Sequence, residues 1–145
     1  MISMKKRGVC LFLLLCTVFV AVAGCTRSAK AATTYNNTSS ASISSYVDSN
    51  GKLHSILIVA GIKGITTQIE ADLYVEKRVL GIFWTRVDIG YTNNIWHDST
   101  TSFHFYNEFI TQLPSTGTYR VKVTYTVSGT GGSADIIPKT NNVTY

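Results

Sequence analysis

The feature that most constrains the fold is a strict alternation of apolar and polar residues between Thr118 and Val127. Tyr and Val occupy every second position of this stretch, and Thr, Arg and Lys fill the positions between them. A period of two places successive side chains on opposite faces of an extended chain, so the stretch predicts a β-strand with one buried and one solvated face. Pro114 and Gly117 before it, and the glycines of 129–132 after it, bound the strand with turns.

Six further stretches carry weaker strand patterns, separated by turn residues about every ten positions. They are Ile43–Asp48, Leu53–Ala60, Ile65–Arg78, Phe83–Tyr91, Ser102–Phe109 and Ala134–Lys139. Asn50-Gly51 favours a hairpin between the first two, and Pro138 places the last strand at a sheet edge. No stretch after the leader has a helical apolar period. The pattern predicts an all-β domain of about seven strands, with the strand number and turn spacing of an immunoglobulin-like sandwich. The alternative is a small β-barrel.

One turn and strand resemble a known fold. Leu113, Gly117, Tyr119, Val121 and Val123 have the spacing L-x-x-x-G-x-Y-x-V-x-V. This spacing resembles the entry to strand F of immunoglobulin-like and fibronectin-type sandwiches, where the Tyr hydroxyl bonds back to the preceding corner. The resemblance implies that Tyr119 is a structural corner residue, and it implies no activity.

The same turn contains Leu113-Pro114-Ser115-Thr116-Gly117, which resembles the LPxTG signal that sortases cut. A sorting signal is followed by an apolar span and a basic tail. A half-polar strand follows here, so we interpret the motif as a turn that leads into the strand.

Residues 1–31 have the features of an export signal. Lys5, Lys6 and Arg7 form a charged start, and Val9–Val22 is almost wholly apolar but short for a membrane span. The protein is therefore expected to be extracellular, either secreted or attached to a membrane.

Two kinds of cleavage site are present. Residues 22–25, Val-Ala-Gly-Cys, resemble a bacterial lipobox, in which Cys25 receives the lipid. Ala29-Lys30-Ala31 and Ala21-Val22-Ala23 match sites of ordinary signal peptidase instead. Four matching residues at the end of the apolar segment favour the lipobox, and two acyl chains would anchor the domain stably.

Charge and cysteine content exclude several classes. All three cysteines, at positions 10, 16 and 25, lie in the leader, so the exported domain has no disulfide framework. Of the 13 basic residues, the five at positions 5, 6, 7, 27 and 30 also lie there, and the remaining eight match the eight acidic residues. A formally neutral domain does not indicate nucleic-acid binding.

The expected organisation is a leader at 1–31, a flexible linker at 32–42, a β-sandwich at 43–140 and a tail at 141–145. Taken whole, the chain resembles the small exported β-domains of unknown function found in Gram-positive bacteria. That resemblance rests on the leader, on a hairpin around Trp84 and on Gly117–Val121.

Catalytic and metal-binding patterns are missing from the sequence. His54, His97 and His104 have no spacing that would let two imidazoles share a metal on one element, and we interpret them as scattered surface residues. No nucleophile elbow occurs, and Glu70, Asp72 and Glu76 share the wet face of one strand. We therefore predict a protein that is not an enzyme and that needs no metal or cofactor.

One turn departs from ordinary composition. Hairpin turns are usually polar, but Leu80, Ile82, Phe83 and Trp84 flank or follow Gly81. Two interpretations stay open: the turn folds back and caps the sandwich, with Trp84 in the core, or these residues form an exposed contact patch.

The sequence is compatible with two functions. The first is a monomeric binding or adhesion domain on the cell surface, whose partner is a protein, a glycan or a membrane surface. The second is a diffusible secreted effector, antibacterial or membrane-active, that uses the same turn on lipid.

The mature N-terminus separates the two. We expect mass spectrometry of the exported protein to find Cys25 at its N-terminus with a diacylglycerol group, because the lipobox lies where the apolar segment ends. A mature chain that begins at Ala32 without lipid would contradict this expectation and favour the diffusible form.

Overall fold

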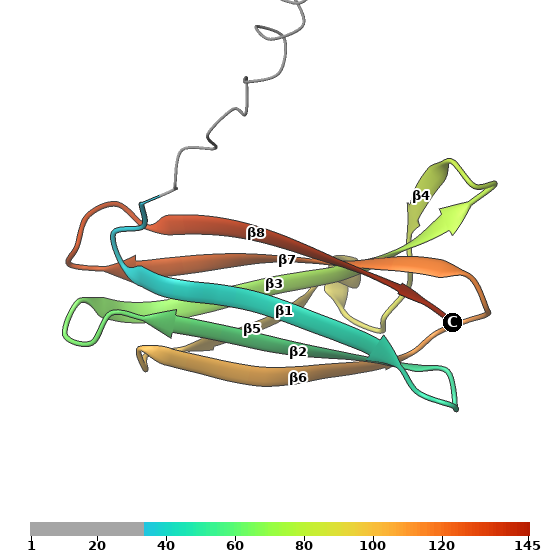
Figure 1. Cartoon of the computed structure of the whole chain (residues 1–145), viewed down its shortest axis with the longest axis horizontal. Coiled ribbons are helices and arrows are strands. Elements are labelled where there is room, and N and C mark those ends of the chain that lie inside the picture. The colour runs from blue at the N-terminus through green and yellow to red at the C-terminus, as the bar shows by residue number, and fades with distance from the viewer. Residues whose placement is uncertain (1–33) are drawn as a thin grey trace, which may run out of the picture. The chain divides into compact units, whose positions relative to one another are not determined.

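The alternating stretches of the sequence become two antiparallel sheets in the computed structural model, which describes residues 34–145 (Figure 1). The smaller sheet has the order β1-β2-β6, and the larger has the order β4-β3-β7-β8, with β5 also pairing with β3. The strands are β1 (Thr38–Val47), β2 (Lys52–Gly61), β3 (Thr66–Val79), β4 (Phe83–Arg86), β5 (Trp96–Thr100), β6 (His104–Gln112), β7 (Thr118–Gly129) and β8 (Asp135–Thr144). These two separate sheets confirm the predicted all-β sandwich and not the barrel.

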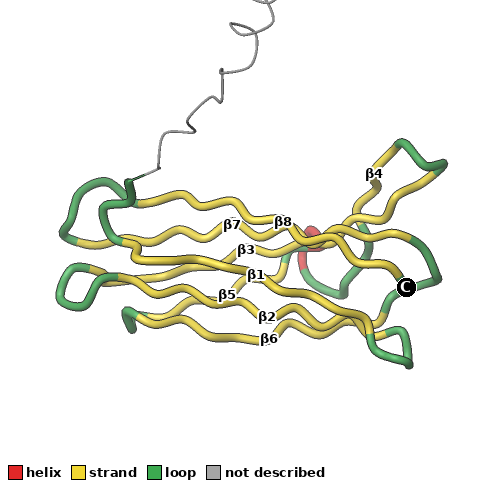
Figure 2. Tube along the Cα trace, viewed as in Figure 1, coloured by secondary structure: helices red, strands yellow, loops and turns green. Residues whose placement is uncertain are grey.

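The loops gather at the two ends of the sheets, and a short 3₁₀ turn, η1 (Thr92–Asn94), lies between β4 and β5 (Figure 2). Within residues 34–145, no helix is long and apolar enough to cross a bilayer. The leader at 1–31 and Cys25 lie outside the described residues.

The pairing of β3 with β7 forms the centre of the core. Four adjacent pairs on the inner face are all buried: Ile69 with Val127, Ala71 with Tyr125, Leu73 with Val123, and Val75 with Val121. This arrangement confirms the predicted buried face of residues 118–127, and the apolar residues of β3 lie opposite it. Leu53, Leu57 and Phe109 cover them from the smaller sheet, and each buried large apolar side chain is worth about 1.5–3 kcal/mol.

Tyr119 forms the expected corner at the start of β7. Its side chain is fully buried, and its hydroxyl donates to the backbone oxygen of Ser115 at 2.5 Å. Leu113 is buried at the other end of the same turn. Residues 113–117 are thus a turn built into the sandwich, as predicted.

The predicted linker at 32–42 is wrong from Asn36 onward. β1 begins at Thr38, and Asn37 is fully buried. The Asn37 side-chain amide donates to Ser133 O at 3.0 Å, and its side-chain oxygen accepts from Gly131 N at 3.1 Å. The small polar composition of this stretch resembles a linker, but these side chains are satisfied by a loop that lies more than ninety residues later.

Asp135, at the start of β8, holds the same N-terminal segment. Its carboxylate accepts from the backbone amides of Asn36 and Asn37 at 2.9 and 2.8 Å. It also accepts from the Thr38 hydroxyl at 2.9 Å. Burial by itself would raise the pKa of Asp135, but these donors outweigh it and hold the pKa below its ordinary value.

The predicted tail at 141–145 is also wrong. β8 continues to Thr144, and Val143 is buried opposite Tyr119. Tyr145 pairs through both backbone groups with Gly117. Alternate residues of this segment are polar because they face solvent, and the single buried Val was too weak a pattern to reveal a strand.

The predicted strand at 83–91 is shorter, and a further strand follows it. β4 ends at Arg86, after which Val87 and Ile89 turn into the core. Trp96 lies at the start of β5 and is only 9% exposed, with its ring 5.7 Å from that of Phe109. The sequence around Trp96 has no clear alternation, so β5 was missed.

We expect Asp135→Ala to lower the free energy of unfolding by about 2–3 kcal/mol at neutral pH, because buried donors lose a charged acceptor. Urea unfolding measures the change. Asp88→Ala is the matched control, since the exposed Asp88 carboxylate accepts only from the nearby Gly90 amide.

The Asp135 contribution should also depend on pH in a defined direction. Because the pKa is lowered in the folded state, the stabilisation is present above the ordinary value of 3.8 and is lost as the pH falls through the folded value. The difference in unfolding free energy between wild type and Asp135→Ala should therefore shrink in acid. Equal urea midpoints for the two proteins at neutral pH would contradict the assignment.

Candidate functional site

The end of β3 extends beyond the sheet that it organises. The last pair between β3 and β7 is Lys77 with Tyr119, whereas β3 continues to Val79 and pairs there only with β4. The β3–β4 hairpin therefore projects from the body of the sandwich as a two-stranded arm (Figure 1).

The end of this arm is apolar and exposed. Leu80, Ile82 and Phe83 have 84%, 68% and 59% of their surfaces exposed, and Val79 is exposed beside them. We call Val79, Leu80, Ile82 and Phe83 the apolar tip. Of the two interpretations of this turn, the folded-back cap is wrong, because the arm points away from the core.

The turn at the tip holds Leu80 in an unusual backbone conformation. Leu80 and Gly81 have φ of 52° and 72°, and the Ile82 amide donates to Val79 O at 3.2 Å. Two consecutive positive φ angles are typical of type I′ turns, which normally carry Asn and Gly. A side chain such as Leu costs about 1–2 kcal/mol in the left-handed region. The chain thus keeps an exposed Leu where a polar residue would be more stable.

Trp84 lies on the outer face of the larger sheet, at the base of the tip. It is half-buried, and the Arg120 guanidinium carbon lies 4.2 Å from its ring centroid. Of the two interpretations left open for Trp84, the placement in the core is wrong, and Trp96 is buried there instead.

Cations surround the base of the arm. They are Lys77 and Arg78 on β3, Arg86 on β4, and Arg120 and Lys122 on β7, and we call them the basic collar. Aromatic rings support four of these side chains: Arg86 and Lys122 lie 3.8 and 5.4 Å from the Tyr74 ring, Arg120 lies over Trp84, and Lys77 lies 5.5 Å from the Tyr119 ring.

Glu76 is the one acidic residue on β3 that lies between cations of both neighbouring strands. Glu76 lies opposite both Arg86 and Arg120 in the sheet. Its ion pair is formed with Arg120. No ion pair joins Arg78 or Arg86 to another residue of the described part of the chain.

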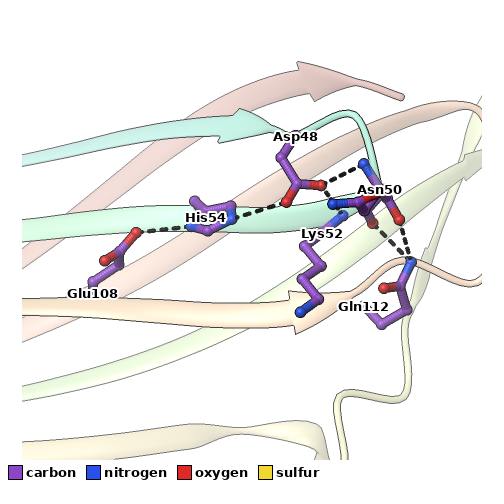
Figure 3. A network of polar contacts seen from close by, with 7 residues as sticks. Asp48, Asn50, Lys52, His54, Glu108 and Gln112 are labelled. Carbon is purple, nitrogen blue, oxygen red and sulfur yellow. Dashed lines mark hydrogen bonds and ion pairs between the residues drawn. The ribbon is translucent and has the colours of Figure 1, made fainter.

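His54 is part of a polar network on the smaller sheet (Figure 3). Its Nδ1 lies 2.8 Å from Glu108 Oε1, and its Nε2 lies 3.5 Å from Asp48 Oδ2. The ring stacks on Tyr46 with centroids 4.7 Å apart. His54 is therefore half-buried and paired, which differs from the predicted scattered surface residue.

The carboxylates of Glu108 and Asp48 raise the pKa of His54. The hydrogen bond with Glu108 is the main cause that raises the pKa of His54, against burial, and Asp48 adds to it. The pKa of Asp48 is lowered, mainly by the backbone amide of Lys52, although burial opposes this. His97 is exposed and pairs with Asp72 at 2.7 Å, and His104 is exposed on β6.

The outer face of the smaller sheet carries a second exposed apolar region, which the sequence analysis did not identify. It consists of Tyr46, Ile58, Tyr106 and Ile110. These residues occupy positions of β1, β2 and β6 that alternation assigns to solvent, so their exposure could have been predicted. Single exposed apolar residues are common, and for that reason the pattern did not indicate a patch.

Grouped metal ligands are not found in the part of the chain that the structure describes. The sequence matches no protein-family model and no curated protein. The apolar tip and the basic collar are therefore the best candidate site on the geometry alone.

The His54 network makes a prediction about pH. We expect NMR titration to give His54 a pKa above its ordinary value of 6.5, and Glu108→Gln to lower that pKa. A raised folded pKa contributes stability that is present below 6.5 and is lost as the pH rises through the folded value. An unchanged pKa in Glu108→Gln would show that Glu108 is not the main partner, and Asp72→Asn is the control.

Proposed function

We propose that this protein is an exported, non-enzymatic binding domain that contacts a cell surface through its apolar tip. The observation that carries the proposal is the exposure of Leu80, Ile82 and Phe83 at the end of a projecting arm. Large apolar side chains grouped on a surface are typical of contact sites.

The backbone of the turn supports this proposal. Strained conformations persist where function retains them, and Leu80 has both a positive φ and a side chain that is 84% exposed. A turn selected for stability alone would carry Asn or Asp at this position. The Leu80 side chain makes little contribution to the core, so contact with a partner explains its retention better than folding does.

The proposed absence of enzymatic activity depends on the sequence patterns. The three histidines lie apart from one another in the fold, and the two that pair do so with carboxylates on outer faces of the sheets. We further propose that the domain is monomeric and does not bind nucleic acid.

The alternative is a diffusible effector that uses the same tip after cleavage at Ala31. Both functions depend on one surface and differ in the fate of the leader, so a test of the tip applies to both.

We expect a triple variant, Leu80→Ser, Ile82→Asn and Phe83→Thr, to lose binding to cells while its melting temperature stays nearly unchanged. These side chains are exposed, so their removal leaves the core intact. Flow cytometry of labelled protein measures binding, and circular dichroism measures melting. The matched control is Ile58→Asn with Tyr106→Thr on the other exposed apolar region.

A single variant of the tip should raise the stability of the domain while it weakens binding. Leu80→Asn should stabilise the domain by about 1 kcal/mol, because Asn adopts the left-handed region at lower cost. It should nevertheless weaken binding. If the triple variant binds cells as the wild type does, or if it melts far below the wild type, the tip is not a contact site.

A further inference from the structure

We infer that the apolar tip and the basic collar together dock onto an anionic lipid bilayer. The inference rests on the proposed function and identifies the surface that the tip contacts. Interfacial segments of proteins bind anionic membranes by this combination of apolar side chains and adjacent Lys and Arg.

The spacing of the two groups fits the layers of a bilayer. A strand advances about 3.3 Å per residue, so Arg78 lies about 3 Å behind Val79, and Arg86, opposite Glu76, lies about 10 Å behind it. Interfacial segments bury their apolar faces about 5–10 Å into the headgroup and acyl boundary. Insertion of the tip to that depth therefore brings Arg78 and Arg86 to the level of the lipid phosphates.

The basic residues of the domain are concentrated around the arm. Residues 34–145 contain eight Lys and Arg residues and eight Asp and Glu residues. Five of the cations form the collar, whereas Glu76 is the one carboxylate among them and is already paired with Arg120. Asp88 lies two residues beyond Arg86, on the side away from the tip. A neutral domain thus presents a positive surface around an apolar end.

The aromatic side chains of the collar suit a membrane interface. Trp84 lies directly behind the tip, and Trp is enriched at the level of lipid headgroups. The Arg86 guanidinium lies 3.8 Å from the centroid of the Tyr74 ring, which leaves the N–H groups at its edge able to bind phosphate.

The size of the tip favours lipid over a protein partner. A stable protein interface takes about 800 Å² from each partner, or about 20–30 residues. Four apolar residues on a two-stranded arm are few for such an interface. Insertion into a bilayer requires depth and charge but no matching shape, and the arm supplies both.

Two tryptophans make insertion directly measurable. Trp84 lies beside the tip, whereas Trp96 is in the core at the start of β5. Brominated lipids quench a tryptophan that enters the bilayer. We expect quenching of the full chain on vesicles of phosphatidylcholine mixed with phosphatidylglycerol, and none in Trp84→Phe, in which Trp96 is the remaining reporter. The full chain is used in every variant, so any contribution of residues 1–33 is common to all.

The variants separate the two components of binding. The tip triple variant should lower partitioning into anionic vesicles roughly 100-fold, because three apolar side chains no longer enter the bilayer. Arg78→Gln and Arg86→Gln should each lower it about fivefold. Lys52→Gln and Lys63→Gln, at exposed sites outside the collar, are the matched controls and should change it less than about twofold.

Salt and lipid composition test the charge component. Raising the salt from about 0.1 M to about 1 M shortens the screening length from about 10 Å to about 3 Å and should weaken binding to anionic vesicles. Vesicles of phosphatidylcholine alone should bind the protein more weakly and should show no effect of the collar variants.

The remaining outcomes overturn the inference in distinguishable ways. Tip-dependent binding to cells without quenching on vesicles would keep the proposed function and replace lipid by a protein or glycan. Equal binding to soluble polyphosphate and to vesicles, without quenching, would show attraction by charge alone. Loss of tip dependence on both cells and vesicles would remove the proposed function as well.

Discussion

The pairing of β3 with β7 is the constraint on which the rest of this structure depends. Its inner face forms the centre of the core, and its outer face carries Glu76, Arg120 and Lys122. β3 has fourteen residues, and its pairing with β7 ends at Lys77. The same strand that builds the core therefore continues into the arm that carries the tip. A shorter β3 would keep the sandwich and lose the candidate site.

The sequence predicted features that depend on residues close together in the chain, and it did not predict those that depend on residues far apart in the chain. Alternation and turn residues predicted the all-β fold, and the resemblance of residues 113–123 to a sandwich corner implied the role of Tyr119, because those features depend on nearby residues. The exposure of the turn at Leu80 was one of two interpretations that the sequence left open. The burial of Asn37 was not predictable in this way, since its partners come from the loop before β8 and from Asp135. The strand at Trp96 was missed because its pairing with β3 follows no local period.

The charge of the candidate site illustrates the same limit. Composition correctly describes the domain as neutral, and neutrality gave no reason to expect an anionic partner. Arg120 and Lys122 come to the arm from β7, about forty residues after Lys77 and Arg78 in the sequence. Only the register of β3 against β4 and β7 gathers them around the tip. A count of charges is therefore a poor guide to what a β-sandwich binds, because strand order distributes them.

The tip lies far from the start of the first strand, which bears on the proposed attachment of the domain. Asn37 contacts Thr66 at the start of β3, whereas the tip follows Val79 at its end. Fourteen residues of strand separate the two by about 45 Å, and Figure 1 shows the start of β1 and the tip at opposite ends of the sandwich. An anchor that precedes β1 would thus join the domain at the end away from the tip. The proposed adhesion function requires the contact surface to lie away from the point of attachment, and this arrangement is compatible with it. A chain released after Ala31 would have no such restriction, so the two proposed functions would use the same tip and differ in the surface that the tip can reach.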